Sequence, residues 1–260
     1  KMNAYPCNVT RISLNISSED YDLNSSNHYS AQGFPTLDYL LNGFTDPIQV
    51  YNGPESSKHL NYLNNLVQDM LTNTNNIINE WNSNREPFIN STENTATSSL
   101  NKLTNDFIFY YEKGFRANKI GIPAGVFSGS PLPQNIEAYY HNLNNNTSKI
   151  LALEALTAIK KFFSGIYFDN TSEGNSLKNY LNHLNALEDG DTLSNVIITT
   201  FNSAETAIND LDDNLMNQIN NNNYQLLVTY DKVQAAVPLL KIDMIGSLNI
   251  DVDYIDADGD

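Results

Sequence analysis

The sequence predicts an all-α protein built from long antiparallel helices. Apolar residues recur every three to four positions through most of the chain, which is the period of an amphipathic helix. Few alternating runs are flanked by turn residues, so strands should be nearly absent. The 260 residues, 40% of them hydrophobic, can bury the core of one large domain or two small ones. Long helices joined by short loops pack as bundles.

The N-terminal third is predicted to begin irregularly. Residues 1–33 are polar and rich in Ser, Asn and Asp, which is typical of loops. A short helix is expected over 35–42, where Pro35 suits the first turn and Gly43 ends the helix. Three apolar residues fall on its expected core-facing stripe: Phe34, Leu37 and Leu41. Asp38 is the only ionised residue in this short apolar helix, so its carboxylate must be solvated, paired or used.

Two long amphipathic helices are predicted next. The first spans 55–84 and stops before Pro87, with one apolar face made of Leu60, Leu63, Val67, Met70 or Leu71, Ile77 or Ile78, and Trp81. The second spans 95–117 and carries an aromatic stripe of Leu100, Leu103, Phe107, Tyr110, Tyr111 and Phe115. A loop rich in Gly and Pro follows over 121–133.

The C-terminal half is predicted to be helical throughout. Helical spacing indicates elements over 134–141, 147–165, 174–187, 192–220 and 223–250. Pro238 lies inside the apolar stripe of the last helix, so it should kink that helix and free a backbone carbonyl near Gln234.

Composition restricts the partners. The 30 acidic and 14 basic residues give a formal net charge of −16, which repels nucleic acid and attracts cations. No apolar run approaches the ~20 residues of a membrane span. Cys7 is the single cysteine, so it cannot form an internal disulfide, and we expect a buried free thiol.

Residues 33–38, Gly-Phe-Pro-Thr-Leu-Asp, resemble the G-x-H-x-x-E signature of the imelysin-like family (peptidase family M75 and its iron-regulated relatives). The glycine is kept, Pro35 replaces the histidine, and Asp38 shortens the acid. Three later segments resemble family blocks in the same order: 116–123, 131–140 and the D-G-D ending at 256–260.

The resemblance implies two helical bundles and an envelope protein. The expected division is 1–120 for a first bundle that is partial at its N-terminus, 121–133 for the interbundle loop, and 134–260 for the second bundle. The chain begins at Lys1 without a signal peptide or a lipid-attachment cysteine. We therefore expect a missing N-terminal segment that exports the protein to the bacterial periplasm or anchors it, as a lipoprotein, to the outer membrane. The implied role is iron uptake, with envelope iron-uptake proteins as partners.

The resemblance also implies a site for a metal ion or a small ligand between the bundles, with these candidate residues: Gly33, Phe34, Asp38, Tyr111, Arg116, Lys119, Ser128 and Glu137. Simpler interpretations remain open. Asp38 near a helix start, and Arg116 with Lys119 near a helix end, would each complement a helix dipole. The loop that carries Ser128 would serve equally as a plain connection.

Iron and calcium are the candidate metals. Asp38 is one candidate ligand, and Asp256, Asp258 and Asp260 match the first, third and fifth positions of a calcium loop. The remaining calcium-loop positions are absent, so such a site would be weak. The histidines, at 28, 59, 141 and 183, form no metal-binding spacing, although His28 lies close enough in sequence to approach Asp38. Haem is the least supported ligand.

No catalytic residue is predicted. A metallopeptidase needs histidine ligands and a carboxylate base, and Pro35 removes the histidine of the signature. No G-x-S-x-G nucleophile motif is present. The sequence therefore favours binding without catalysis. The alternatives are an M75-type metallopeptidase with a remodelled site and a non-catalytic surface interaction protein.

Overall fold

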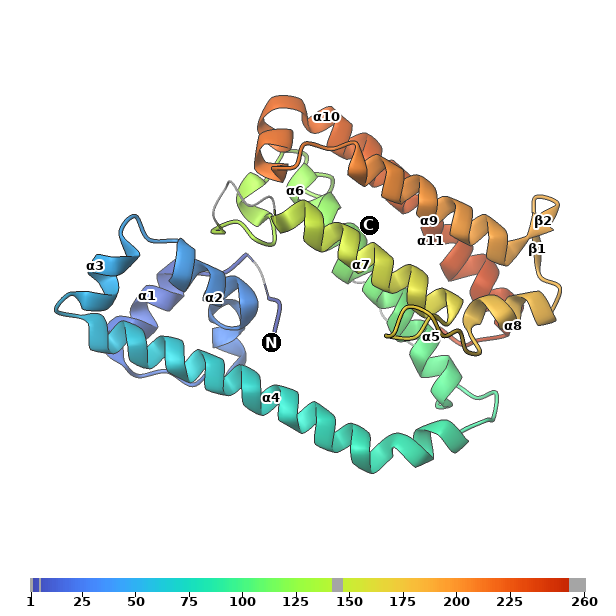
Figure 1. Ribbon diagram of the computed structural model, residues 1–260, viewed down its shortest axis with the longest axis horizontal. Coiled ribbons are helices and arrows are strands. Elements are labelled where there is room, and N and C mark those ends of the chain that lie inside the picture. Colours follow the sequence, from blue (N-terminus) through green and yellow to red (C-terminus); the bar gives the residue numbers. More distant parts are fainter. Residues whose placement is uncertain (1, 5, 142–146, 253–260) are drawn as a thin grey trace. The chain divides into compact units, whose positions relative to one another are not determined.

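The computed structural model describes residues 2–4, 6–141 and 147–252 and shows an all-α protein, as predicted (Figure 1). The sheet in this part of the chain is a small antiparallel hairpin of β1 (Leu187–Glu188) and β2 (Asp191–Thr192). No helix in the same part of the chain is both long and apolar enough to cross a membrane.

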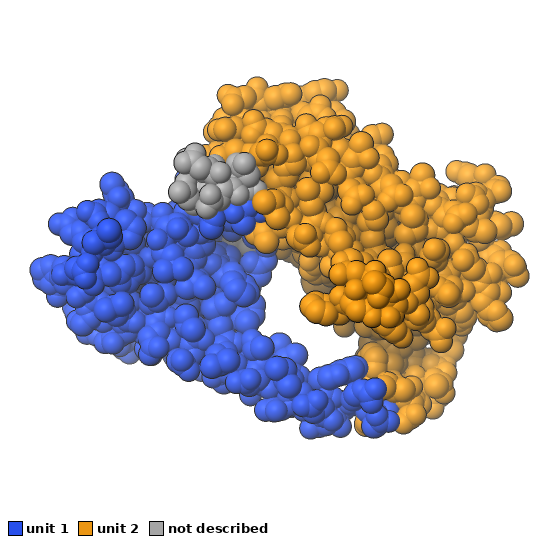
Figure 2. All heavy atoms as spheres, in the orientation of Figure 1, with its two compact units in different colours: residues 1–86, 134–147 blue, residues 87–133, 148–260 orange. Residues whose placement is uncertain are grey.

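The chain forms two compact units, which Figure 2 distinguishes by colour. Unit 1 comprises residues 1–86 and 134–147, and unit 2 comprises 87–133 and 148–260. Unit 1 is therefore discontinuous in sequence, because the segment that begins at Gln134 rejoins it.

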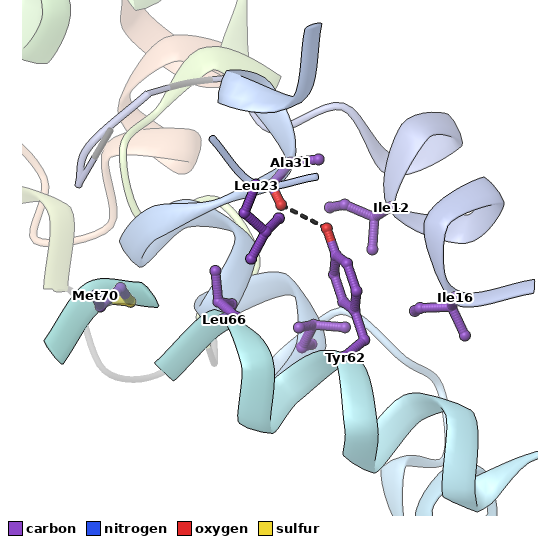
Figure 3. Packing of buried hydrophobic residues seen from close by; sticks show 8 residues of the cluster. Ile12, Ile16, Leu23, Ala31, Tyr62, Leu66 and Met70 are labelled. Atoms are coloured by element: carbon purple, nitrogen blue, oxygen red, sulfur yellow. Dashed lines mark hydrogen bonds between the residues drawn. The ribbon is translucent and has the colours of Figure 1, made fainter. Parts of the chain in front are cut away.

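Unit 1 packs around Tyr62. Its helices are α1 (Val9–Ser18), the 3₁₀ helix η1 (Ser26–Ala31), α2 (Gly33–Asn42), α3 (Pro47–Asn52) and α4 (Ser56–Asn90). The fully buried Tyr62 hydroxyl donates to the Ala31 carbonyl at 2.6 Å and accepts from the Asn15 amide at 3.1 Å (Figure 3). Because its polar end is paired, the ring can fill the apolar core without a desolvation penalty. The cluster around it contains Ile12, Ile16, Leu23, Leu40, Leu66 and Met70.

Three expectations for unit 1 were wrong. Residues 9–18, expected to be irregular, form α1, since Asn8 caps its first turn and Ile12 and Ile16 share a buried face. In α2 the buried side chains are Pro35, Thr36 and Leu40, of which Leu40 belongs to the Tyr62 cluster. Of the predicted stripe, Leu37 packs against this cluster, while Phe34 and Leu41 are exposed.

The third error concerns α4. This helix runs past Pro87 to Asn90, because a proline in the last turn costs only one intrahelical hydrogen bond. Its buried residues are Tyr62, Leu66 and Met70. Of the predicted apolar face, Met70 is buried and Leu63 packs against the core, but most of the others are exposed: Leu60, Val67, Leu71, Ile77, Ile78 and Trp81.

Unit 2 is a bundle with an aromatic core. Its longer elements are α5 (Ser99–Phe109), the π-helix η2 (Tyr110–Gly121), α7 (Thr147–Ser164), α9 (Leu193–Asn209) and α10 (Leu215–Gln234). The shorter ones are α6 (Ile122–Ala124), η3 (Pro133–Asn135, at the junction with unit 1), α8 (Leu177–His183), α11 (Ala236–Pro238), the π-helix η5 (Leu239–Met244) and α12 (Ile245–Leu248). The Phe201 ring lies 5.6 Å from that of Tyr111 and 5.9 Å from that of Phe163. Phe107, Tyr111 and Phe115 of the predicted aromatic stripe are buried.

Several predicted boundaries changed after Phe109. The helix predicted over 95–117 continues as the π-helix η2, and the one predicted over 192–220 ends at Asn209. Residues 134–141, predicted to be helical, contain no α-helix. Their only helical element is the short 3₁₀ helix η3. The break predicted for Pro238 is confirmed, because α10 ends at Gln234, the residue whose carbonyl a proline at 238 leaves unbonded.

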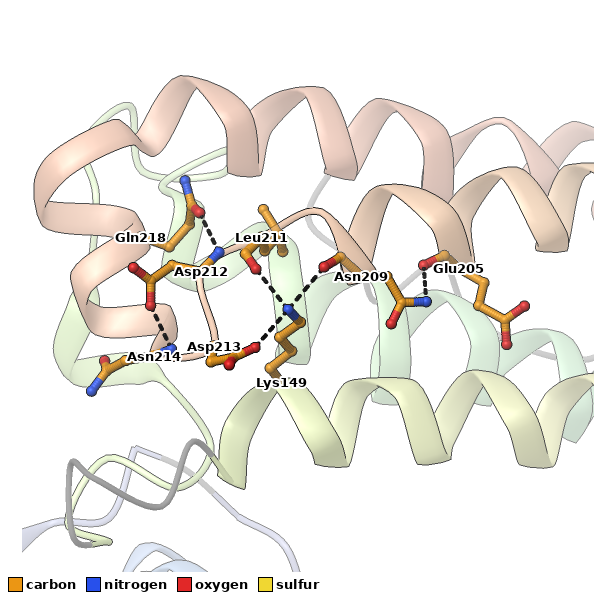
Figure 4. Close-up of polar contacts among 8 residues, drawn as sticks. All are labelled: Lys149, Glu205, Asn209, Leu211, Asp212, Asp213, Asn214 and Gln218. Atoms are coloured by element: carbon orange, nitrogen blue, oxygen red, sulfur yellow. Dashed lines mark hydrogen bonds and ion pairs between the residues drawn. The ribbon is translucent and has the colours of Figure 1, made fainter.

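Lys149 explains where α9 ends. Its ammonium group, almost fully buried on α7, donates to the carbonyls of Asn209 at 2.9 Å and Leu211 at 2.6 Å (Figure 4). It also pairs with the Asp213 carboxylate at 2.9 Å. A cation that binds the last carbonyls of a helix satisfies otherwise unpaired acceptors and complements the dipole.

Candidate functional site

The signature region forms the start of α2 in unit 1. Gly33 adopts φ +77°, in the left-handed region that favours glycine, and turns the chain into the helix. The Phe34 amide then donates to the Met2 carbonyl at 2.8 Å, which holds the N-terminal segment against the helix start. Asp38 follows one turn later, with its side chain 14% exposed.

The Asp38 carboxylate has three neighbours. One oxygen accepts from the Tyr140 backbone N–H at 3.0 Å, and the other accepts from the Asn42 amide at 2.9 Å. That second oxygen lies 3.6 Å from Nδ1 of His141, whose side chain is 34% exposed. Asp38 and His141 therefore form a partly accessible carboxylate–imidazole pair.

His141 is the residue that sequence reasoning missed. The spacing of the four histidines predicts no shared site, and sequence proximity points to His28 as the one that could approach Asp38. In the structure, His28 Nδ1 lies 2.7 Å from the Asp22 carbonyl instead. No local spacing connects His141 to Asp38, because 102 residues separate Asp38 from Tyr140, the neighbour of His141. The available signal was that His141 directly follows the block at 131–140 that resembles the family.

Aromatic rings and Cys7 surround the pair. The Tyr140 ring lies 4.9 Å from that of Tyr39 and 4.7 Å from that of Tyr139. Burial raises the pKa of the Cys7 thiol to about 11, a hydrogen bond with Tyr140 partly offsets this, and the Asp38 charge adds to it. The Cys7 thiol is therefore protonated at neutral pH. It is a free cysteine, as expected, but half-buried rather than fully buried.

Two buried polar side chains lie unpaired beside Asp38 in the sequence. Gln32 and Thr36 are both fully buried, and neither the Gln32 amide nor the Thr36 hydroxyl has a hydrogen-bond partner in the described part of the chain. An unsatisfied buried polar group costs about 1–3 kcal/mol. The start of α2 therefore carries hydrogen-bonding capacity that its own unit does not use.

Four candidate residues lie in unit 2. Arg116 on η2 is fully buried between the rings of Phe127 and Tyr230, 5.9 and 5.7 Å from their centroids. It donates to the Tyr230 hydroxyl at 2.7 Å and to Gln234. Tyr111 is also buried and donates to the Val233 carbonyl at 2.7 Å. These contacts join η2 to α10.

The remaining candidates are less enclosed. Lys119 is half-buried in the last turn of η2. The exposed Ser128 hydroxyl donates to the Ser130 carbonyl at 2.8 Å. In unit 1, Glu137 accepts from the Asn3 amide, and Phe34 is exposed. The structure thus brings Asp38 together with Tyr140 and His141, and Arg116 with Tyr111 and Tyr230.

No group of three or more His, Cys, Asp or Glu side chains in the described residues is arranged to hold a metal ion. The predicted ligands Asp256, Asp258 and Asp260 lie outside those residues. Asp38 with His141 supplies two donors of the kinds that iron and zinc accept, so the pair suits a metal that brings its other ligands with it.

The fold and site define an all-α protein with a degenerate G-x-H-x-x-E signature at the start of a short helix. The chain belongs to the imelysin family (peptidase family M75), whose family profile matches residues 1–240. Neither the curated proteins nor the solved structures contain a match to it.

Proposed function

We propose that this imelysin family member binds a metal ion, without catalysis, as part of iron uptake at the bacterial envelope. The observation that carries the proposal is the pairing of Asp38 with His141 on the family signature. The pair supplies a carboxylate and an imidazole where the signature would have placed a histidine and a glutamate.

The geometry suits shared coordination. Metal–ligand bonds of about 2.0–2.2 Å place two donors of a tetrahedral ion about 3.4 Å apart. The Asp38 oxygen and the His141 nitrogen are 3.6 Å apart, so a small adjustment of one side chain brings both to bonding distance. The Tyr140 N–H fixes the other carboxylate oxygen, and this second contact orients the ligand group.

The described residues supply two protein donors at this position, which favours a chelated or hydrated ion over an ion held in a permanent cage. Open coordination positions would be filled by water or by the small molecule that carries the iron. The net charge of −16 favours cations over anionic partners. Envelope location, and cooperation with other iron-uptake proteins, follow from the resemblance to the family's iron-regulated members.

The test is thermal unfolding of metal-free protein with Fe²⁺ (kept anaerobic), Fe³⁺, Zn²⁺ or Ca²⁺, each alone and with citrate. Binding at 100 times the dissociation constant stabilises the fold by about 2.7 kcal/mol. We expect an iron-dependent rise in Tm that Asp38→Asn and His141→Gln each abolish.

Asp69→Asn is the matched control. Asp69 on α4 accepts from Asn73 at 2.9 Å, the same arrangement as Asp38 with Asn42, and it is also partly buried. This variant should keep the full iron response. An iron response that survives both Asp38→Asn and His141→Gln would overturn the site, and no response to either iron ion would overturn the iron function.

A metallopeptidase is the rival that the same site permits, because His141 restores a histidine beside the acid. That activity needs a third ligand and a water-activating base. Incubation of iron- or zinc-loaded protein with a mixed peptide library, read by mass spectrometry, should give no cleavage. If the protein cleaves peptides and Asp38→Asn abolishes that cleavage, the metallopeptidase function would replace the binding function proposed here.

A further inference from the structure

Unit 2 carries a second candidate site, a surface trough that is separate from Asp38 and Arg116. A cavity of about 520 Å³ lies over α5, α7 and α8, and a second of about 320 Å³ lies over α5 and α7. Leu103 and Phe162 line both, so the two cavities adjoin at these side chains. Together they have the size typical of a small-molecule site.

The two ends of the trough differ in chemistry. The larger cavity ends in five polar side chains: Asn175, Ser176, Asn179, Tyr180 and His183. The smaller one is lined by the apolar side chains of Phe107, Ala158 and Ile159 together with Tyr110 and the exposed Asp106. The trough is therefore polar at one end and apolar along the rest of its length.

The apolar part of the trough exposes large hydrophobic side chains to solvent. Phe162 is 41% and Leu103 is 37% exposed, and the Phe162 ring stacks on that of Phe107 at 5.1 Å. This stacking orients the Phe162 ring, so that it forms an apolar surface in the trough. Because apolar surface left in water costs free energy in proportion to its area, covering this surface is favourable.

The polar end has unused hydrogen-bonding groups. The Ser176 hydroxyl caps α8 and contacts Asn179. The Tyr180 hydroxyl, the His183 ring and the Asn175 amide have no partner in the part of the chain that the structure describes. No carboxylate, lysine or arginine lines this end. The groups present are amides, hydroxyls and an imidazole, which pair best with an uncharged polar head.

We propose that this trough binds a monomeric, uncharged, single-chain amphiphile. Its polar head, such as a polyol, contacts Asn179, Tyr180 and His183, and its alkyl tail lies across Phe162 and Leu103 toward Tyr110. A charged head at the polar end would lose hydration without gaining an opposite charge there, because the one carboxylate of the trough, Asp106, lines the other cavity.

The test is isothermal titration of the whole chain with decyl maltoside below its critical micelle concentration. We expect saturable binding of one molecule per chain. Affinity should rise about fourfold per added methylene between the octyl and decyl homologues. Dodecanoate and dodecyltrimethylammonium should bind at least tenfold more weakly than dodecyl maltoside.

Leu103→Asp should weaken decyl maltoside binding by at least tenfold, because it places a charge where the two cavities join. Leu151→Asp is the matched control, since Leu151 lies on α7, outside the trough, and is also 37% exposed. Tyr180→Phe should cost about two- to tenfold through loss of one hydrogen bond.

Three results would overturn the proposal. They are absence of saturable binding, equal binding by wild type and Leu103→Asp, and equal binding of the charged amphiphiles. A fourth result would also overturn the proposal: if the protein co-sediments with phosphatidylcholine vesicles and Leu103→Asp abolishes this, the trough binds a membrane surface instead.

Discussion

The ammonium group of Lys149 donates to the carbonyl of Leu211 at 2.6 Å, so a side chain of α7 fixes the end of α9. Lys149→Met should lower the free energy of unfolding by about 2–3 kcal/mol, because buried carbonyls lose a charged donor. Urea denaturation measures this change. Lys160→Met is the control. Lys160 lies on α7, like Lys149, and pairs with Glu205 of α9 at 2.8 Å, but it is more exposed, so its loss should cost under about 1 kcal/mol. Equal costs would contradict the capping role.

Thr36→Val should stabilise the protein by about 1 kcal/mol. The Thr36 hydroxyl is fully buried without a partner in the described residues, and valine keeps its shape without the polar atom. Thr229→Val is the matched control, because that equally buried hydroxyl donates to the Gln225 carbonyl at 2.9 Å. The control should destabilise by about 1 kcal/mol. Destabilisation by Thr36→Val in a thermal melt would show that the hydroxyl has a partner, such as a buried water.

Gly121→Ala should destabilise unit 2 by about 1–3 kcal/mol. A Cβ at this position would lie 2.7 Å from the Phe127 ring and 2.9 Å from the Tyr230 ring, and these two rings enclose Arg116. In Gly246→Ala the new methyl meets nothing within 4 Å, and the residue lies in the helix α12. That control should be neutral or slightly stabilising. Differential scanning calorimetry of both variants checks the contrast, and equal effects would exclude crowding at Gly121.

Cys7 should alkylate slowly until strongly alkaline pH. Its pKa is about 11 in the folded protein against 9.0 for a free thiol, so the rate with iodoacetamide should keep rising toward pH 11. In urea the rate should level off near the ordinary pKa. Because the folded pKa is the higher one, the protonated thiol stabilises the fold fully below pH 9, and this contribution is lost as the pH rises through about 11. A native rate that levels off near pH 9 would place the thiol in water.

The sequence was sufficient for the helical class and for the family, because periodicity and short motifs are local signals. It was less reliable for which helix face is buried. Leu60 and Val67 fit the helical period as well as Tyr62 and Leu66 do, and only the position of Ile12 and Ala31 decides between them. The π-helical turns of η2 also escaped prediction, since their sequence keeps an α-helical apolar spacing.

The sequence identified one residue of the candidate site, Asp38, but not the residues that surround it. Asp38 stood out as the one charged residue in an apolar helix. Its neighbours Tyr140 and His141 come from a distant segment, and only the fold places them there. Lys149 gave no local signal for the same reason, since its three partners lie at the last residue of α9 and just beyond it, at 209–213.

The discontinuity of unit 1 sets an order of events during synthesis. A ribosome that has released the chain only as far as residue 86 has produced most of unit 1 but neither Tyr140 nor His141. Asp38 therefore emerges without its backbone donor and its imidazole, and waits while residues 87–133 are made. Domains usually fold in the order in which they leave the ribosome. Here the carboxylate–imidazole pair of Asp38 and His141 can form only after residues 87–133, which belong to the other unit, have been translated.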